Sequence, residues 1–513
     1  MTKVIQTGKD IIRVSTDWLG RELSMEVNKV GFRTTASVIV RYGDTVVLGI
    51  ADSGEVNPNL DYFPLSIDYE EKYYASGKIS SSRFIKREGR PSDEAILIGR
   101  LIDRPIRPLF PKGYRNECQV VTTVLSMDPA FRPDAVAMLA ASAALMLTGV
   151  PFDGPIAGLR IGLDEQDNFR AFMSRSELEQ SRLDLFVAGK TDKVMMVEAG
   201  ANEVSEDTLA DAFAWVLEQI KPALDLQLEL RDLVQPEAQS YQLVTPDEQI
   251  AEQVEIYLSD KLTDDLRVTY AERNPRIAEI KQAMLEHFQA DYDEATWPEQ
   301  QADYLDAFDK VMHQNVRQGI IERGVRPDGR QLDEIRPLSS EVHLLPRTHG
   351  SSLFTRGLTQ ALNIVTLAPL SYAQLVDTME VTDGERRYMH HYNAPGYTVG
   401  EVKRMGSPGR REIGHGYLAE RALLPVLPTE EDFPYAIRSV TEIMSQNGST
   451  SMAATCSSCL ALMDAGVPIS APVSGIAMGL MMDGDTPYVL SDIADAEDFA
   501  GDMDFKVTGT SKG

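Results

Sequence analysis

The chain has 513 residues, of which 43% are hydrophobic, so about two or three domains with real cores are expected. Its 78 acidic and 50 basic residues give a net charge of -28, which repels polyanions unless basic residues gather locally. The 3 cysteines exclude a disulfide framework, and no apolar run reaches the roughly 18 residues of a membrane helix. With no secretory or transit pattern at its N-terminus, the protein is expected to be cytoplasmic, without a membrane partner.

The first part of the chain reads as strands separated by turns. Residues 38–40 and 46–48 are apolar and flank Tyr42-Gly43-Asp44, which predicts a β-hairpin. The same pattern returns later, where residues 353–359 form a strand and turn around Gly357. Both copies of this pattern point to sheet-containing domains.

A basic stretch follows the first hairpin. Between Arg83 and Arg115 the chain has 9 basic residues against 4 acidic ones. An aromatic ring beside clustered cations suits single-stranded RNA, because the ring can stack on a base while the cations contact phosphates. A basic surface loop would explain the stretch equally well. The candidate RNA-binding residues are Phe84, Lys86, Arg87, Arg90, Arg100 and Arg104.

An internal repeat comes next. Residues 134–162 match residues 451–479 without a gap, and Gly149-Val150-Pro151 returns as Gly466-Val467-Pro468. A repeat of this length means that one domain is present twice.

Between the copies, from Ser205 to about Arg323, glycine almost vanishes. Amphipathic patterns there predict four helices, at residues 207–233, 247–262, 276–289 and 299–322. The charge of this segment is explained most simply as a solvated face, and no chemistry is assigned to it.

The second copy contains Arg410, Arg411 and His415 ahead of a predicted helix. This segment is the counterpart of the basic stretch in the first copy. Adjacent arginines can simply keep a surface soluble. The planar guanidinium group also matches phosphate oxygens better than the point charge of lysine does.

A hydroxyl-rich turn, Ser449-Thr450-Ser451, opens an apolar helix that ends near Gly466. The first N–H groups of a helix lack partners and carry the positive end of its dipole, so added hydroxyls make a seat for a tetrahedral anion such as phosphate. Serine and threonine at a helix start are more often only caps.

An acidic cluster lies near the end of the chain. From Gly501 polar and apolar residues alternate, which predicts a strand with Asp502, Asp504 and Lys506 on one face, close to Asp498. Converging carboxylates are costly unless a cation lies between them, and Mg²⁺ takes one or two carboxylates together with water and phosphate oxygens. Acidic clusters are more often solvated loops, but Phe505 and Val507 on the other face predict a partly buried strand, which favours a metal.

The two copies differ where this chemistry would lie. Opposite Thr450 and Ser451 the first copy has Pro133 and Asp134, which remove a donor and add a negative charge. Phe186 replaces Lys506, and Leu178 replaces Asp498. The first copy has therefore lost the chemistry, and its basic stretch indicates that it holds substrate.

These motifs, together with Arg326-Pro327-Asp328-Gly329-Arg330, resemble the polynucleotide phosphorylase family over nearly the whole chain. The resemblance implies an α+β fold in which two RNase PH-like domains, with mixed sheets and packed helices, are joined by an all-helical domain. The expected ranges are 1–235, 236–322 and 323–513. The implied activity is processive 3′-to-5′ phosphorolysis of single-stranded RNA, reversible as polymerisation of nucleoside diphosphates.

The resemblance also implies the roles of the site residues. The catalytic set is Asp498, Asp504, Lys506 and His415, and the phosphate-binding set is Ser449, Thr450, Ser451, Arg410 and Arg411. Asp498 and Asp504 would hold Mg²⁺ or Mn²⁺. A homotrimer is expected, with other RNA-degradation proteins as further partners. Family members usually continue into KH and OB-type domains, so the chain is expected to be truncated before them.

Two other readings stay open. A hydrolytic metal-dependent 3′ exonuclease would need no anion seat, so phosphate-dependent release of diphosphates separates it from a phosphorolase. A noncatalytic RNA-binding scaffold would not need the acidic cluster of the second copy.

Overall fold

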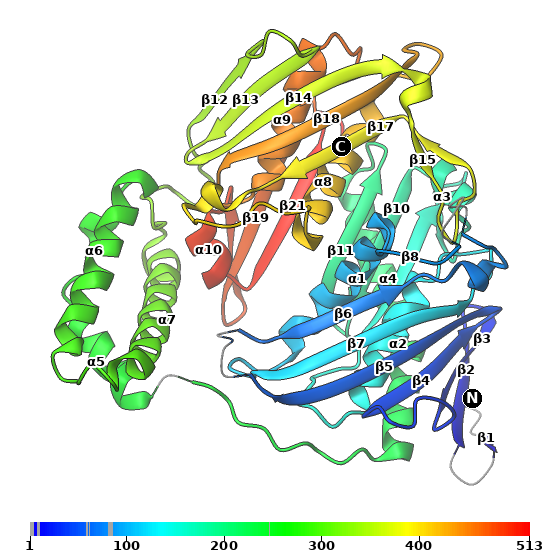
Figure 1. The fold of residues 1–513 in the computed structure, drawn as a ribbon, viewed down its shortest axis with the longest axis horizontal. Coiled ribbons are helices and arrows are strands. Elements are labelled where there is room, and N and C mark those ends of the chain that lie inside the picture. The colour runs from blue at the N-terminus through cyan, green and yellow to red at the C-terminus, as the bar shows by residue number, and fades with distance from the viewer. Residues whose placement is uncertain (1–4, 8–10, 58–59, 61, 81–85, 246) are drawn as a thin grey trace. The chain divides into compact units, whose positions relative to one another are not determined.

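The computed structural model describes residues 5–7, 11–57, 60, 62–80, 86–245 and 247–513 (Figure 1). Contacts divide the chain into two compact units. The first holds the first copy of the repeat and a short segment from the second copy, and the second holds the helical segment and the rest of the second copy. Their limits are Met1–Val244, Gln374–Arg386 and Lys512–Gly513 for the first unit, and Thr245–Ala373 and Arg387–Ser511 for the second.

The first unit is built on two sheets. The larger contains β1 (Ile5–Thr7), β2 (Ile11–Trp18), β3 (Arg21–Val27), β4 (Ala36–Tyr42), β5 (Thr45–Val56), β7 (Asn116–Ser126) and β6 (Leu65–Glu70), in that spatial order. The smaller contains β11 (Val194–Ala201), β10 (Leu183–Gly189), β8 (Ala157–Leu163) and β9 (Phe169–Ala171). The predicted hairpin is confirmed as β4 and β5, which pair Tyr42 with Thr45 around Gly43 at a φ of 56°.

Helix α2 (Asp134–Met146) lies between these sheets, and every one of its residues is buried. It packs on β4, β5 and β7 of one sheet and on β8 of the other. Gly49 of β5 permits this approach, because a Cβ there would lie 2.3 Å from the Ala140 carbonyl oxygen. The other helices of this unit are α1 (Asp93–Ile106), α3 (Arg175–Gln180) and α4 (Glu206–Val234), and a hairpin of β15 (Gln374–Val376) and β16 (Gly384–Arg386) belongs to it as well.

The second unit repeats this arrangement. One sheet contains β12 (Leu338–Val342), β13 (Gly350–Arg356), β14 (Thr359–Pro369), β18 (Tyr435–Ser445) and β17 (Tyr388–Asn393), and the other contains β20 (Thr486–Ser491), β19 (Ser474–Asp483) and β21 (Met503–Gly509). Helix α9 (Thr450–Asp464) packs on β13 and β14 of one sheet and on β19 of the other, as α2 does in the first copy. Helices α8 (Arg410–Leu423) and α10 (Asp495–Ala500) complete the copy. The predicted duplication and α+β class are confirmed.

The helical segment contributes α5 (Glu248–Leu258), α6 (Tyr270–Gln289) and α7 (Trp297–Arg323). Val254, Met284 and Phe308 form part of its core. The predicted helix at residues 276–289 begins after Pro275, but α6 starts at Tyr270 and accommodates the proline, which costs it one backbone hydrogen bond. None of the helices in the described ranges is long and apolar enough to cross a membrane.

Candidate functional site

The turn before α9 is strained and incompletely bonded. Ser449 precedes the helix with a φ of 44°, in the left-handed region that residues other than glycine rarely adopt. The hydroxyl oxygens of Ser449 and Ser451 are buried and have no hydrogen-bond partner within the described chain. An unsatisfied buried hydroxyl costs about 1–3 kcal/mol, so two at one helix start indicate a place prepared for a ligand.

Two buried arginines bind backbone carbonyl oxygens of this turn. Asp492 is completely buried and accepts hydrogen bonds from Arg336, at 2.7 and 2.8 Å, and forms an ion pair with Arg356 at 2.9 Å. Arg336 also donates to the carbonyl oxygen of Asn447, and Arg356 donates to that of Ser449 at 2.9 Å. Because the arginines occupy the carbonyl groups, the serine hydroxyls and the first N–H groups of α9 are left to meet an anion.

Helix α8 carries the candidate phosphate-binding cations of the second copy. Arg410 and Arg411 are its first two residues, and both are exposed. His415 lies further along α8, and its ring packs edge-on against Tyr392 with the ring centroids 5.1 Å apart. The Tyr392 hydroxyl is 2.6 Å from Thr450 Oγ1. Tyr392 therefore connects His415 to the start of α9.

The acidic residues come from α10 and β21. Asp504 and Lys506 lie two residues apart on β21 and form an ion pair. Burial raises the pKa of Asp498 and the Asp504 charge raises it further, whereas Lys506 and Arg411 oppose the rise. Asp504, Lys506 and Arg411 therefore lie close enough to Asp498 to influence its charge.

Asp495 joins the acidic residues to the turn before α9. It lies three residues before Asp498 on α10, and burial raises the pKa of its carboxyl group while Arg336, Arg411 and the backbone of Gly448 lower it. The turn before α9 and the carboxylates of α10 therefore lie close together in the second copy.

The prediction for Asp502 is wrong. Strand β21 begins at Met503, and Asp502 accepts hydrogen bonds from Arg317 of α7 and from the backbone N–H of Met482, both at 2.7 Å. The alternation of polar and apolar residues continued one residue beyond the true start of the strand. Asp502 therefore serves the packing of α7 instead of the acidic cluster.

Two carboxylates alone make an incomplete metal site. Within the described ranges no group of three or more histidine, cysteine, aspartate or glutamate side chains is arranged to hold a metal ion. Mg²⁺ commonly takes one or two protein carboxylates and fills its other positions with water and substrate phosphate oxygens. Asp498 and Asp504 fit that mode of binding, in which RNA and phosphate complete the coordination.

The first copy fills its own anion seat with carboxylates. Asp134, the counterpart of Ser451, is fully buried and binds Arg160 at 2.6 Å. Glu94, the counterpart of Arg411 at the same sequence offset, forms ion pairs with Arg132 and with Arg175. A phosphate here would meet two internal carboxylates, which fits the prediction that this copy has lost the chemistry.

The basic stretch of the first copy is exposed but only partly described. Phe84 lies outside the described residues. Lys86, Arg87 and Arg90 are exposed ahead of α1, as is Arg104 on that helix, whereas Arg100 is half-buried. Arg87, Arg90 and Arg104 make no hydrogen bond or salt bridge within the part of the chain that the structure describes. These three arginines are therefore exposed cations without an ion-pair partner in the described ranges.

Four residues that support the site carry no signal in the sequence. Tyr392, Asp492, Arg336 and Arg356 act through contacts between residues far apart in the chain, and no local pattern marks them. Asp495 could have been found, because its spacing of three residues from Asp498 places both on one face of a helix.

Comparisons with known proteins agree with this architecture. The 3′ exoribonuclease family, domain 1, matches residues 20–151 and 334–468, and domain 2 of that family matches residues 154–217. The family described as polyribonucleotide nucleotidyltransferase, RNA binding domain, matches residues 248–331. The first of these matches falls once in each copy, in agreement with the duplication.

Several curated proteins match almost the whole chain. The polyribonucleotide nucleotidyltransferase of Bacillus pumilus is 49% identical over 97% of the chain and 70% of that relative. The proteins of the same name from Bacillus subtilis and Staphylococcus epidermidis are 48% and 47% identical, over 97% of the chain and 70% and 71% of those relatives. A crystal structure of rice Rrp46 matches 36% of this chain and 80% of its own, with 21% identity and a TM-score of 0.30.

Proposed function

This chain belongs to the polyribonucleotide nucleotidyltransferase family and is a phosphorolytic 3′-to-5′ exoribonuclease, and we propose that inorganic phosphate attacks RNA at the start of α9. The observation that carries the proposal is the pair of buried, unsatisfied hydroxyls of Ser449 and Ser451 in the same site as Asp498 and Asp504. Phosphorolysis is the family's reaction, so the hydrolytic and noncatalytic alternatives give way to it.

The seat binds and orients phosphate. The hydroxyls of Ser449 and Ser451 and the first N–H groups of α9 donate to its oxygens, and Arg410 and Arg411 neutralise its charge. Thr450 is held by Tyr392 and fixes the turn, while His415 supports Tyr392 from α8. Because the donors are placed before phosphate arrives, little reorganisation is needed when it reacts.

The reaction exchanges one phosphorus–oxygen bond for another. A phosphate oxygen attacks the phosphorus of the terminal 3′,5′ linkage, and the bond to the 3′-oxygen of the preceding nucleotide breaks. The products are a nucleoside 5′-diphosphate and an RNA shortened by one nucleotide, whose 3′-oxygen takes up a proton. Lys506, which is paired with Asp504, is the candidate proton donor. The bonds formed and broken are similar in energy, so the reaction also runs as polymerisation.

Asp498 and Asp504 are the residues that would hold Mg²⁺ or Mn²⁺ in this site. A bound divalent cation would stabilise the negative charge that develops on the phosphate oxygens in the transition state. The protein's own part is to keep two carboxylates close together in spite of their repulsion, with Lys506 and Arg411 moderating it.

Substrate holding, assembly and location complete the proposal. The cations at residues 86–104 would contact the backbone of single-stranded RNA. The three domains would span residues 1–235, 236–322 and 323–513. The protein would act as a cytoplasmic homotrimer and associate with other RNA-degradation proteins. The high identity to curated relatives and the exposed side chains of Arg87, Arg90 and Arg104 support these expectations.

The phosphate seat is tested by Ser451→Ala. Loss of a hydrogen bond to a charged group costs about 1.5–3 kcal/mol, so the KM for phosphate should rise by roughly 10- to 100-fold. The KM for RNA, and kcat at saturating phosphate, should change little. An unchanged KM for phosphate would show that the seat lies elsewhere.

A further inference from the structure

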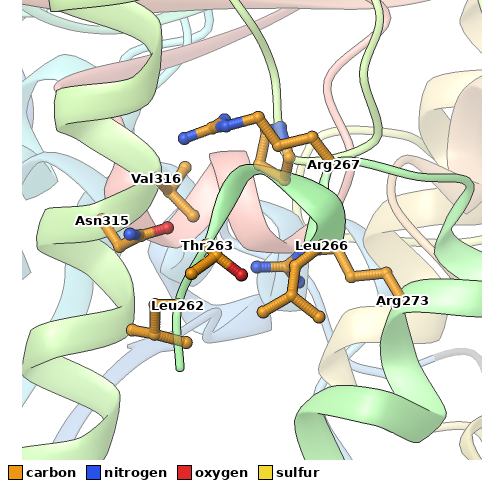
Figure 2. A pocket seen from close by; sticks show the side chains of 8 residues that line it. Leu262, Thr263, Leu266, Arg267, Arg273, Asn315 and Val316 are labelled. Atoms are coloured by element: carbon orange, nitrogen blue, oxygen red, sulfur yellow. The ribbon is translucent and has the colours of Figure 1, made fainter. Parts of the chain in front are cut away.

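Figure 2 shows a pocket in the helical segment, between the link from α5 to α6 and helix α7. Arg267, Arg273 and Asn315 are among its lining residues. The cavity itself is only about 10 Å³, which is room for roughly one water molecule and not for a substrate. Buried polar groups that lack a partner lie instead in the first unit.

The hairpin of β15 and β16 belongs to the second copy by sequence but packs within the first unit, close to α3 (Figure 1). Thr378 and Met379 in its turn are buried, and Met379 is part of the hydrophobic core of the first unit. The carbonyl oxygen of Asp377 accepts a hydrogen bond from the Tyr73 hydroxyl at 2.8 Å. Apolar and polar contacts together therefore dock the hairpin.

Glu380, in the same turn, adds a carboxylate to the anion seat of the first copy. Only 5% of its side chain is exposed. Its Oε2 lies 3.6 Å from Arg132 Nε and 3.5 Å from Arg175 Nη1, so it pairs with two arginines. Both arginines also pair with Glu94. Each of these two cations is therefore shared between carboxylates.

The charges around Glu380 do not balance. The groups that face it from the neighbouring elements are Tyr69 of β6, Glu71 after that strand, Glu94 of α1, Arg132 before α2, Asp134 of α2 and Arg175 of α3. Asp134 also binds Arg160, which in turn pairs with Asp184. In this network the carboxylates at positions 71, 94, 134, 184 and 380 outnumber the arginines at positions 132, 160 and 175.

The excess carboxylates are also incompletely bonded. Oε1 of Glu380, Oε1 of Glu71 and the Tyr69 hydroxyl are buried and have no hydrogen-bond partner in the part of the chain that the structure describes. A buried ionised carboxylate with an unbonded oxygen is costly, and uptake of a proton removes that cost. The docked hairpin therefore favours the protonated form of Glu380.

The electrostatics of the two carboxyl groups agree with this direction. Burial raises the pKa of Glu380, and Glu94 and Asp134 add to the rise, whereas Arg132 and Arg175 oppose it. Burial also raises the pKa of Glu71 to about 7, with the charge of Glu380 adding to the rise. Because the docked state holds protons more tightly than the free hairpin does, docking is strongest below about pH 4.5 and weakens as the pH rises through these raised values.

We propose that Glu380 is a proton-controlled latch, which holds the hairpin of the second copy on the first copy while it is protonated and loosens it on ionisation. The hairpin continues through Arg387 into β17, the strand that carries Tyr392. The latch therefore ties the copy that has lost the chemistry to a strand of the copy that keeps it.

Hydrogen exchange of the full chain, followed by mass spectrometry, tests the latch. After correction for the intrinsic pH dependence of exchange, the protection of residues 374–386 in the wild type should fall at least tenfold between about pH 5.5 and pH 8.5, as expected for a shift of about one pKa unit. Glu380→Gln keeps the shape of the side chain and removes its charge, so the protection of this segment should stay constant over the same range.

Two further variants make the outcome decisive. Glu385→Gln removes a carboxylate from an exposed position of β16 in the same hairpin and should show the wild-type fall. Glu71→Gln leaves Glu380 in place but removes the neighbouring charge, so it should reduce the fall. A constant protection in the wild type, or a wild-type fall in Glu380→Gln, would overturn the proposal. If Glu380→Gln does not fold, an undiminished fall in Glu71→Gln overturns it instead.

Discussion

At the scale of single residues, the proposed metal site of the second copy depends on which acidic side chains lie close together. Asp504 acts on Asp498 and pairs with Lys506, whereas Asp502, two residues earlier, is bound to Arg317. We expect Asp504→Asn to lower phosphorolysis and the reverse polymerisation together by at least 100-fold, because both directions pass through one transition state. Release of labelled diphosphates and extension of RNA from diphosphates measure the two directions.

The neighbouring carboxylate supplies the control for this prediction. Asp502→Asn has the same change of charge two residues away and should retain most of the activity in both directions. RNA binding should survive in both variants. Wild-type turnover by Asp504→Asn at saturating Mg²⁺ would remove this residue from the proposed metal site.

A second residue couples the stability of the first unit to pH. Glu71 is held by Ser92 at 2.8 Å, its other oxygen is buried without a hydrogen-bond partner in the described chain, and burial raises its pKa to about 7, with Glu94 and Glu380 adding to the rise. Because the folded state prefers the protonated form, the stability it contributes is complete below about pH 4.5 and is lost as the pH rises through 7.

Glu71→Gln should therefore unfold less readily than the wild type at pH 8, by about 2–3 kcal/mol, and similarly to it at pH 4.5. Urea unfolding at several pH values measures the difference. Glu70→Gln changes the adjacent carboxylate, which is half-buried and paired with Lys72, and should not show this pH-dependent gain. Parallel pH profiles for Glu71→Gln and the wild type would contradict the assignment.

At the scale of secondary-structure elements, the strongest sequence signals were periodic or repeated. The gapless match of residues 134–162 with 451–479 located α2 and α9, and the position of Asp134 opposite Ser451 indicated which copy kept the chemistry. Signals at element ends were weaker. Pro275 looked like a helix boundary but lies inside α6, and Asp502 looked like a strand residue but precedes β21.

The support of the site could not be predicted for a different reason. Asp492 joins Arg336 and Arg356 to the turn before α9, across sequence separations that exceed 130 residues for each arginine. Such contacts depend on how strands and helices pack, and local periodicity carries no information about them. The resemblance to a family supplied the roles of His415 and the two arginines of α8, which their spacing alone left open.

The segment that precedes α1 carries its own prediction. Arg87→Ala combined with Arg90→Ala removes two exposed cations, so affinity for long single-stranded RNA should fall. The slope of log K against log salt should decrease in magnitude by roughly 1.4, at about 0.7 per phosphate contact. Filter binding at several salt concentrations measures both effects, and phosphorolysis of very short oligonucleotides should change less.

A matched control distinguishes this local role from the effect of total charge. Lys221→Ala combined with Arg231→Ala also removes two cations from the first unit, but from α4, where both are half-buried and ion-paired. Its RNA affinity should stay close to that of the wild type. Equal loss of activity on long and short RNA in the Arg87 and Arg90 double variant would instead assign these residues to catalysis or folding.

At the scale of the whole molecule, the net charge and the duplicated domain together predict one oligomeric state. Each chain carries a net charge of -28 and nevertheless acts on a polyanion, so its exposed arginines must be concentrated where RNA enters. RNase PH-like domains resemble one another in forming rings of six, and a chain with two copies would reach that number as a trimer. Closed rotational symmetry is the usual outcome for soluble oligomers.

We therefore expect three chains to associate and to place three copies of the basic stretch around one opening, through which only single-stranded RNA can pass. Light scattering should give three times the chain mass of 56.8 kDa, and activity should fall when dilution dissociates the trimer. The Arg87 and Arg90 double variant should still form the trimer, because these side chains would face RNA and not the neighbouring chain. A monomer that degrades long RNA processively would contradict the ring.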